Sequence, residues 1–266
     1  MTETMSPEIR AESIYTVNGA DRVRSGFPKL SARLGAVFDF VQKTAFAVDV
    51  GCDHGYIPAA LVLSGKCPRA AACDVVPGPL GKASENIHAM GLESRVELIL
   101  SDGLKNPDIY RMAKECGGEG TLIIAGMGGI LMRRILTEAP DLEETFSRLV
   151  LQPQSDIALV RKWLGGHGWA IVREEMLTED GKFYTLFAAE KTFGCPEMSE
   201  EELEFGPLLL KTADPVLRQY LLRLKAEKQR ILASLAGADP GRGEKRRAEI
   251  LAGLKTIERA LARYEM

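Results

Sequence analysis

The stretch "FAVDVGCDHGYIPAALV", residues 46–62, decides the fold of this chain. It begins with apolar, strand-like residues, passes through a turn that contains Gly51 and Gly55, and ends in residues that favour a helix. This order is typical of a nucleotide-cofactor turn, because glycine allows close backbone approach and the start of a helix presents free N–H groups. Taken alone, it is equally typical of a plain strand-to-helix connection. The unusual feature is that Asp53 and His54 occupy the middle of the turn.

The composition indicates an ordinary globular protein. Of the 266 residues, 45% are hydrophobic and 27% are charged. No apolar run approaches the roughly 18–20 residues of a membrane span, and the N-terminus lacks the order of a secretory signal. We therefore expect a cytoplasmic protein without a membrane partner. The five cysteines and three histidines do not have the spacing of metal ligands, so we expect no metal.

Seven strand-like runs follow one another, each bounded by loop residues. They lie at 45–51, 69–75, 95–103, 121–129, 148–153, 169–177 and 183–191. Segments long enough for a helix separate most of them, at 56–65, 78–90, 129–139 and 155–167. This alternation predicts an α/β protein with a parallel sheet covered by helices. The short "TEDGK" (178–182) joins the last two runs and predicts an antiparallel hairpin.

A seven-stranded sheet with a terminal antiparallel hairpin describes the Rossmann-like sheet of class I methyltransferases better than a dehydrogenase sheet. This assignment is an analogy of architecture. We assign residues 29–210 to such a domain, with a first helix within 29–42. Residues 1–28 are polar and lack sustained periodicity, so we expect them to form a disordered extension.

Residues 211–266 have a different character. Apolar residues recur at helical spacings in 217–235 and in 250–264, and "AGADPGRG" (236–243) between them interrupts any helix. This predicts an antiparallel helical hairpin of the coiled-coil type. Each seam spans only about three heptads, so we expect it to pack on the body or on another copy, in a monomer or a weak homodimer.

The charge of the chain is distributed unevenly. Residues 211–266 carry 13 Lys and Arg against 7 Asp and Glu, whereas the remainder carries 21 against 30. A basic tail on an acidic body favours a polyanionic partner, although solvated helices have similar charges.

Four of the predicted strands end in residues that suit a ligand. Asp74 lies about 20 residues beyond the glycine turn, where an acidic side chain can accept the hydroxyls of a ribose. Asp102 can meet an adenine edge. Ligands bind at the carboxyl ends of parallel strands, so the sequence predicts one crevice there. The cofactor-binding candidates at these ends are Asp49, Gly51, Asp74, Asp102, Gly103, Gly126 and Met127.

The charge of the glycine turn discriminates between cofactors. A pyrophosphate usually calls for a third glycine in G-x-G-x-x-G, and the carboxylate of Asp53 would repel it. S-adenosylmethionine carries no phosphate, but it has a sulfonium cation and an amino group. The acidic turn therefore favours S-adenosylmethionine over a nicotinamide cofactor.

The sequence resembles the bacterial tRNA (adenine(22)-N(1))-methyltransferase family. The combination of "GCDHGYIP", "AGMGG" and "LQP" is specific to it, whereas Gln154 stands where the family has asparagine. The matching segments, which cover most of 30–210 in order, are "LSARL" (30–34), "VDVGCDHGYIPAAL" (48–61), "GPLGKASENIHAMGL" (78–92), "SDGL" (101–104), "IIAGMGGILMRRIL" (123–136), "RLVLQP" (148–153), "EDGKFY" (179–184) and "EFGPLLL" (204–210).

The resemblance implies methylation of N1 of an adenine in the D-arm region of tRNA, with S-adenosylmethionine as the donor. N1 has a free lone pair and needs no strong base, so the work of the enzyme is alignment and desolvation. The methylated ring is cationic, and a carboxylate nearby would stabilise it. Because N1 lies on the pairing edge, the base must be unpaired or extruded.

On this reading Asp53, His54 and Tyr56 are the catalytic candidates, with Tyr56 stacking on the base, and Gln152 and Pro153 complete the wall of the pocket. Structural alternatives remain for the first three. Asp53 can cap the following helix, His54 can bond a loop carbonyl, and Tyr56 can belong to the core.

Three arginines are further candidates. Arg33 can bind the cofactor carboxylate or a phosphate, or form a surface ion pair. Arg133 and Arg134 are expected to follow tRNA phosphates together with the basic residues of the tail. Two other functions stay open: a small-molecule methyltransferase that dimerises through the tail, and a non-catalytic RNA-binding protein of the same fold.

Overall fold

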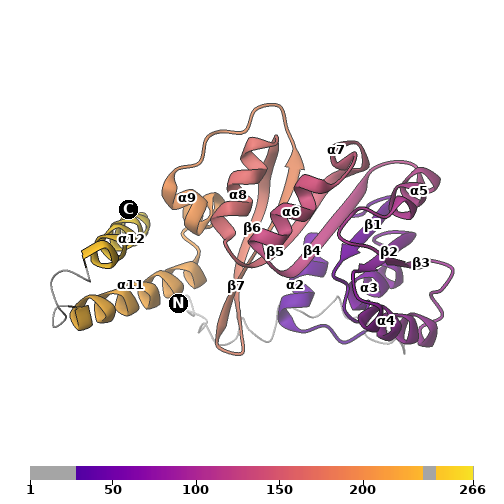
Figure 1. Cartoon of the computed structure of the whole chain (residues 1–266), viewed down its shortest axis with the longest axis horizontal. Helices are drawn as coiled ribbons and strands as arrows, with labels where there is room; N and C mark the ends of the chain where they lie inside the picture. Colours follow the sequence, from indigo (N-terminus) through magenta and orange to yellow (C-terminus); the bar gives the residue numbers. More distant parts are fainter. Residues whose placement is uncertain (1–27, 236–243, 266) are drawn as a thin grey trace, which may run out of the picture. The chain divides into compact units, whose positions relative to one another are not determined.

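The computed structural model describes residues 28–235 and 244–265. Its seven strands form one sheet in the order β3-β2-β1-β4-β5-β7-β6 (Figure 1). β1 pairs in parallel with β2 and β4, β2 pairs in parallel with β3, and β6 and β7 are antiparallel. The class I methyltransferase sheet with its antiparallel end is confirmed. The disordered extension was expected at residues 1–28, and residues 1–27 of it lie outside the described residues, as does the loop 236–243.

The chain divides into two compact units. One unit contains the residues up to Gly126 and Arg134–Leu151, and the other contains Met127–Arg133 and the residues from Gln152 onward. The boundary that we expected at 210/211 separates a catalytic domain from an appendage, whereas these units are defined by compactness alone. A separate C-terminal domain therefore stays a prediction.

The first unit holds the strand ends that matter for a ligand. Its strands are apolar on both faces, and every residue of β1 is buried. Its elements are α2 (Ala32–Phe40), β1 (Phe46–Val50), α3 (Tyr56–Ser64), β2 (Arg69–Asp74), α4 (Pro77–Ala89), β3 (Val96–Leu100), α5 (Pro107–Cys116), β4 (Gly120–Gly128), α6 (Gly129–Glu138), α7 (Leu142–Thr145) and β5 (Phe146–Ser155). Of these, β4, α6 and β5 belong partly to the other unit.

The second unit is built around a tight hairpin. The β6–β7 turn places Asp180 at φ 50° and Gly181 at φ 71°, between the paired residues Glu179 and Lys182. Positive φ at both central residues defines the two-residue turn that an Asp-Gly pair favours. The elements of this unit are α8 (Ile157–Gly166), β6 (Trp169–Glu179), β7 (Lys182–Lys191), α9 (Glu200–Phe205), α10 (Pro207–Lys211), α11 (Pro215–Leu235) and α12 (Glu244–Ala262).

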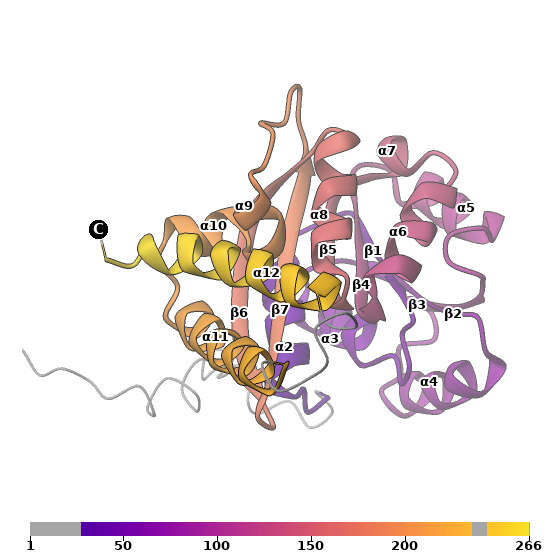
Figure 2. The same cartoon turned by 60° about the vertical axis from the view of Figure 1, so that its left-hand side comes forward.

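The two predicted C-terminal helices are present as α11 and α12, which lie next to each other (Figures 1 and 2). Their inner residues do not form an isolated seam, because they share a core with β6, α9 and α10. The hairpin therefore packs on the body, as its short seams predict, whereas coiled-coil packing stays a prediction. The buried members of this core are Met176, Phe205, Leu209, Leu210, Leu217, Leu221, Ile257 and Ala260.

A buried ion pair organises the same unit. The side chains of Arg161 and Glu174 are 1% and 0% exposed, and Arg161 Nε donates to Glu174 Oε1 at 3.1 Å. Arg161 also donates to the carbonyls of Leu203 and Glu204, and Glu174 accepts from the N–H of Leu208 at 2.8 Å. These bonds join α8 and β6 to α9 and α10.

Gly206 makes this arrangement possible. Its φ is 99°, and a Cβ there would lie 2.7 Å from Glu174 Oε2 and 3.0 Å from Arg161 Nη2. Both the backbone conformation and the lack of space require glycine. In the segment "EFGPLLL" (204–210), Gly206 thus lies directly against the buried ion pair. The carbonyl of Glu204 and the N–H of Leu208 form hydrogen bonds with its two side chains.

No described helix is both long and apolar enough to cross a membrane. Within 28–235 and 244–265, no three His, Cys, Asp or Glu side chains gather in the way that a metal ion requires. All five cysteines are free thiols, and burial raises the pKa of Cys67 to about 12 and that of Cys52 still further. The buried thiols are therefore held in their unreactive, protonated form.

Candidate functional site

Hydrogen bonds hold the carboxyl ends of three neighbouring strands together. The N–H groups of Gly51 and Cys52 both donate to the carbonyl of Cys73, at 2.8 and 3.0 Å, so the end of β1 is tied to the end of β2. The N–H of Ser101 donates to the carbonyl of Asp74 at 2.9 Å and ties β3 to β2. The strand ends that carry Asp49, Asp74 and Asp102 therefore meet at one edge of the sheet, as the sequence predicts.

Asp49 is a buried carboxylate without a partner. The residue is 5% exposed, and its carboxylate accepts no hydrogen bond from any described residue. Burial, and to a lesser degree the charge of Asp74, raises the pKa of this carboxyl to about 7. Burying a carboxylate in this way is unfavourable unless a ligand supplies the missing donors or a positive charge.

Asp74 offers one free acceptor at the end of β2. Its Oδ1 accepts from the N–H of Val76 at 2.9 Å, which closes an Asx turn. Oδ2 accepts nothing from the described part of the chain. Next to it, Val75, Val76 and Leu100 are 60%, 51% and 53% exposed at the ends of β2 and β3. These apolar side chains were missed by the sequence analysis, although apolar residues directly after a strand end are a visible indication of a ring-binding surface.

Asp102 differs from the other two aspartates. Its carboxylate accepts from Lys105 Nζ at 2.8 Å and from Arg134 Nη2 at 2.9 Å. The hydrogen bond from Lys105, followed by the charge of Arg134, lowers the pKa of Asp102. The carboxylate that we expected at an adenine edge is thus engaged by two cations. The adjacent Gly103 has φ 64°, and a Cβ there would lie 3.1 Å from Ile135.

The glycine turn after β1 has three residues at positive φ. They are Gly51 at 78°, Gly55 at 69° and, between them, Asp53 at 50°. Asp53 thus holds the left-handed conformation that glycine favours, and strain of this kind gathers at functional sites. α3 begins at Tyr56 with Gly55 as its N-cap and without a capping side chain. Asp53 therefore does not cap this helix.

Asp53, His54 and Tyr56 form a small polar cluster. His54 Nε2 lies 3.6 Å from Asp53 Oδ2, whose side chain is 73% exposed. The rings of His54 and Tyr56 stack with their centroids 5.4 Å apart and their planes 16° apart. The imidazole bonds no described loop carbonyl; instead the carbonyl of His54 accepts from Asn86 Nδ2 at 3.0 Å. Tyr56 is half-buried and stands outside the core.

In the second unit, the end of β4 packs against the end of β5. A Cβ on Gly129 would lie 2.5 Å from the carbonyl oxygen of Asp156 and 2.6 Å from that of Ser155. A Cβ on Gly128 would lie 3.1 Å from Ser155 Oγ. The glycines of "AGMGG" that follow Met127 are therefore needed for contact between two strand ends. The sequence analysis assigned only Gly126 and Met127 of this segment, and assigned them to cofactor binding.

The remaining candidates lie in different settings. Gln152 is 0% exposed within β5 and donates from Nε2 to the carbonyl of Pro153 at 3.4 Å. Arg33 lies in the first turn of α2 and is half-buried. Arg133 is exposed on α6 and has no ion-pair partner in the described ranges, whereas its neighbour Arg134 is bound to Asp102. The roles of all these residues stay predictions.

Known proteins resemble this chain in sequence and in fold. A family model described as a methyltransferase domain matches residues 30–187. A tRNA (adenine(22)-N(1))-methyltransferase of Bacillus subtilis (strain 168) is 35% identical over 162 residues, which are 61% of this chain and 65% of that enzyme. Sp1610 of Streptococcus pneumoniae, assigned as a tRNA (m1A22) methyltransferase, is 33% identical; the alignment covers 88% of this chain and 100% of that chain, with a TM-score of 0.78. This chain belongs to the tRNA (adenine(22)-N(1))-methyltransferase family.

Other structures of the family contain cofactors. Sp1610 has also been solved in complex with S-adenosyl-L-methionine, and this structure has a TM-score of 0.75. TrmK of M. capricolum has been solved with S-adenosyl-homocysteine; it is 26% identical, the alignment covers 88% of this chain and 98% of that chain, and the TM-score is 0.77. Both alignments cover 88% of this chain, which is more than the domain match at residues 30–187.

Proposed function

We propose that this protein transfers a methyl group from S-adenosylmethionine to N1 of adenine 22 in the D-arm region of tRNA, in the cytoplasm. Membership of the family supports the reaction and the substrate. The observation that carries the proposal is the pair of aspartates at the ends of β1 and β2, which offer unfilled acceptors. They lie beside a turn that presents Asp53, His54 and Tyr56.

The aspartates fit this cofactor. Bound S-adenosylmethionine would supply an electrophilic methyl group on a sulfonium, together with an ammonium group and two ribose hydroxyls. Asp49 is buried and lacks a donor, so it would hold a positive group of the ligand. Asp74 has Oδ2 free for a ribose hydroxyl. The same acidic edge would repel the pyrophosphate of a nicotinamide cofactor.

The turn after β1 suits the methyl acceptor. N1 of adenine attacks with its own lone pair, so the protein needs to hold the ring in line and exclude water, without a base. The stacked rings of His54 and Tyr56 provide a flat surface for the purine. Asp53 presents a carboxylate that caps no helix and can stabilise the positive charge that develops on the ring.

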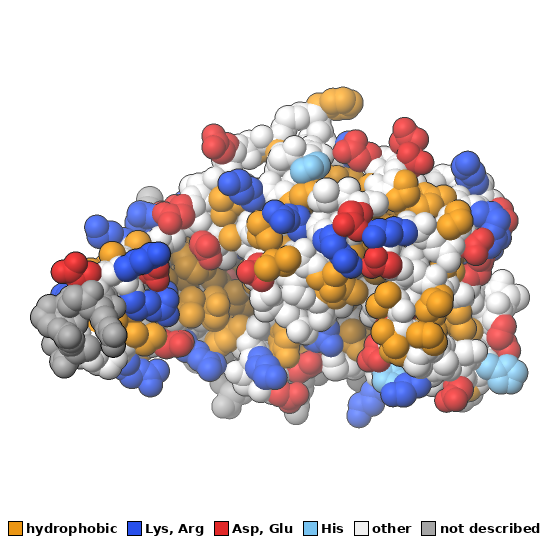
Figure 3. Space-filling view, viewed as in Figure 1, with side chains coloured by type: hydrophobic (Ala, Val, Ile, Leu, Met, Phe, Trp, Pro, Cys, Tyr) orange, Lys and Arg blue, Asp and Glu red, His pale blue; other side chains and the backbone are white. Residues whose placement is uncertain are grey.

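Basic residues would hold the tRNA. Among the cations of α11 and α12, Lys225 pairs with Glu258, and Arg259 pairs with Glu200 and Glu201. Lys245 and Arg247, by contrast, are exposed and have no ion-pair partner among the residues described. Figure 3 shows Lys and Arg side chains interspersed with acidic ones on the face in view, which favours several separate phosphate contacts over one uniform basic surface.

Mass mapping tests the proposal directly. The protein is incubated with S-adenosylmethionine and an unmodified tRNA transcript, and the methylated nucleoside is located after nuclease digestion. We expect N1-methyladenosine at position 22, and none in a transcript with guanosine at this position. No methyl transfer to tRNA would favour the non-catalytic alternative.

Removal of residues 211–266 then separates the remaining alternatives. An RNA enzyme would lose affinity for tRNA, whereas a small-molecule enzyme that dimerises through its tail would keep its activity and lose its oligomeric state. Because α11 and α12 share a core with β6, α9 and α10, circular dichroism must first show that the shortened protein is folded. Sedimentation of the full chain gives the oligomeric state, which we propose to be a monomer or a weak homodimer.

A further inference from the structure

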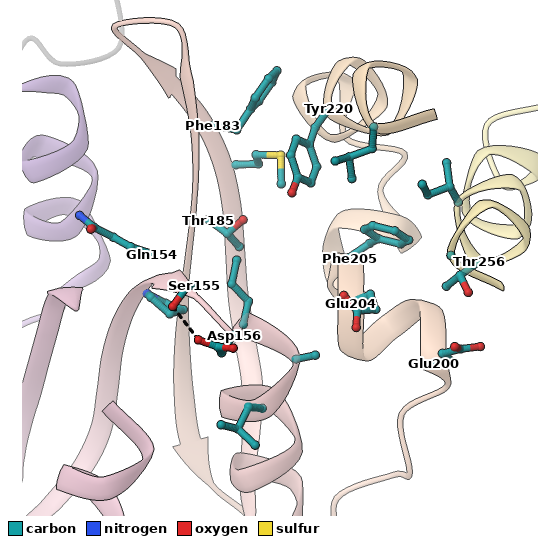
Figure 4. Close-up of a pocket in the computed structure, with 18 of the residues that line it drawn as sticks. Gln154, Ser155, Asp156, Phe183, Thr185, Glu200, Glu204, Phe205, Tyr220 and Thr256 are labelled. Atoms are coloured by element: carbon teal, nitrogen blue, oxygen red, sulfur yellow. Dashed lines mark hydrogen bonds between the residues drawn. The ribbon is translucent and has the colours of Figure 1, made fainter. Parts of the chain in front are cut away.

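The second unit contains a pocket that the proposed reaction does not use. Its volume is about 740 Å³, within the range of about 300–1,000 Å³ that is common for ligand pockets. The turn from β5 into α8 forms one side, the β6–β7 strands form the back, and α9, α11 and α12 form the other side (Figure 4). Figure 3 shows a hollow with hydrophobic side chains beside α11 and α12.

One wall of this pocket is aromatic. The rings of Phe183 on β7 and Tyr220 on α11 pack in a tilted arrangement, with centroids 5.1 Å apart and planes 52° apart. Met176 and Phe205 continue the wall toward the core. Such a surface suits a flat ring, because aromatic side chains give large contact areas with little loss of conformational entropy.

Two hydroxyl groups in the pocket lack partners. Thr185 is 4% exposed, and its Oγ1 makes no hydrogen bond to any described residue. The Tyr220 hydroxyl also makes none, and burial raises its pKa, so it stays a neutral donor. Figure 4 shows this hydroxyl directed toward the space that Thr185 and Phe205 border. Both hydroxyls are therefore available to donate to, and accept from, a ligand that enters the pocket.

The charges in the pocket define that ligand further. Lys228 lies over Gly253, where a Cβ would be 2.9 Å from its Nζ, and it has no ion-pair partner within the described ranges. Three carboxylates also line the pocket. That of Asp156 accepts from Ser155 Oγ at 2.7 Å, that of Glu200 pairs with Arg259, and the third belongs to Glu204. A suitable ligand is therefore a flat ring with hydrogen-bond donors and acceptors that carries one negative charge near Lys228.

We propose that this pocket binds a nucleotide of the tRNA other than the methylated adenine. The base would stack on Phe183 and Tyr220, its edge would bond the hydroxyls of Thr185 and Tyr220, and its phosphate would meet Lys228. The pocket reaches Ile130, which directly follows Gly129, and Pro153, which lies in β5 two residues before Ser155; Gly128 and Gly129 contact Ser155 where β4 and β5 meet. RNA that approaches these strand ends therefore passes the pocket. This inference rests on the proposed function and adds a subsite that selects the substrate.

Conservative variants test the subsite. Thr185→Val and Tyr220→Phe each remove a hydroxyl and keep the volume, so the fold is preserved. Each lost hydrogen bond should weaken tRNA binding about 2- to 10-fold, and the double variant about 5- to 50-fold. The affinity for S-adenosylmethionine should not change. Tyr264→Phe is the matched control, because this hydroxyl donates to the carbonyl of Asp214 outside the pocket; tRNA binding should be unchanged. Thermal unfolding of each variant verifies folding.

Abasic tRNA transcripts identify the nucleotide. Each transcript lacks one base near position 22, and binding is measured for the wild type and for the double variant. We expect one abasic position that weakens wild-type binding and causes no further loss in the double variant. Unchanged tRNA affinity of the double variant, or additive losses at every position, would overturn the subsite.

Two outcomes separate this proposal from others. If free AMP raises the unfolding temperature of the wild type but not of the double variant, while tRNA affinity is equal in both, the pocket binds a free nucleotide and the assignment to tRNA is wrong. Failure of the wild type to methylate any tRNA would instead contradict the proposed function, and this is visible without any variant.

Discussion

The protein buries carboxylates in two ways, one in each unit. Glu174 in the second unit is fully buried, and it is matched by the guanidinium of Arg161 and by backbone N–H groups of α10. Asp49 in the first unit is nearly as buried, but its carboxylate has no partner among the described residues, and its pKa is raised to about 7. A buried charge with a complete set of partners supports the scaffold, whereas one without partners marks a site that awaits a ligand.

The largest effect is expected from breaking the complete pair. Arg161→Met leaves Glu174 buried without its counter-charge and should lower the free energy of unfolding by about 4 kcal/mol. Urea denaturation measures the loss. The double variant Arg161→Met with Glu174→Leu removes both charges and should recover much of the stability. Equal losses in the single and double variants would show that packing, and not charge, holds these elements together.

The unmatched carboxylate should respond to pH in the opposite sense to a salt-bridged one. The pKa of Asp49 is raised from 3.8 to about 7 in the folded protein, so the native state retains a proton that the unfolded chain has lost. Stability should therefore fall as the pH rises from about 4 to about 7, by on the order of 4 kcal/mol, and should then level off.

Asp49→Asn provides the control for this pH dependence. The variant cannot lose a proton, so its free energy of unfolding, measured without cofactor, should lack this slope. Its affinity for S-adenosylmethionine should be reduced most at pH 8, where the wild-type carboxylate is charged. If the free energy of unfolding depends on pH in the same way in the wild type and in the variant, the pKa of Asp49 does not differ between the folded and the unfolded protein, and the prediction is wrong.

The exposed carboxylate of Asp53 sharpens the comparison, because the role that we propose for it lies in the reaction and not in folding. Asp53→Asn keeps the shape and the tolerance for positive φ but removes the charge. We expect the single-turnover rate of tRNA methylation to fall about 100-fold, with S-adenosylmethionine binding by calorimetry nearly unchanged. Loss of cofactor binding together with activity would assign Asp53 to the cofactor instead of the base. Asp53→Gly, which relieves the backbone strain, should be as inactive and more stable.

The smallest effect is expected from two adjacent arginines on α6. Arg133 lacks an ion-pair partner in the part of the chain that is described, whereas Arg134 is bound to Asp102. Arg133→Ala should weaken tRNA binding a few-fold and lower the slope of log affinity against log salt by about one. Arg134→Ala should change the slope less. A larger change for Arg134 would show that its bond to Asp102 opens when RNA binds.

Much of the fold was predictable, because the information is local. The seven strands, the helices α2, α3, α4, α6 and α8, and the hairpin turn at Asp180 and Gly181 follow from apolar periodicity and from the φ angles that each residue permits. The helices α5, α7, α9 and α10 were not predicted. α9 and α10 span only six and five residues, which is too short for a reliable periodic pattern.

The candidate site was predictable only in part, because some of its contacts join residues that are far apart in the sequence. The sequence places aspartates after the first three strands of a parallel sheet, and parallel pairing brings these ends together. Pattern alone reveals only one of the two cations that bind Asp102: Lys105 lies three residues further along the chain, whereas Arg134 of α6 lies 32 residues further.

By itself, the sequence determined the succession of strands and helices along the chain, the acidic character of the turn after β1 and the family to which the protein belongs. Tertiary structure alone decided which buried charges are matched, why "EFGPLLL" and "AGMGG" need their glycines, and that two hydroxyls face an aromatic pocket without partners. The reason is physical. Backbone conformation depends on neighbours in sequence, whereas partners, burial and the space around a Cβ depend on residues that only folding brings near.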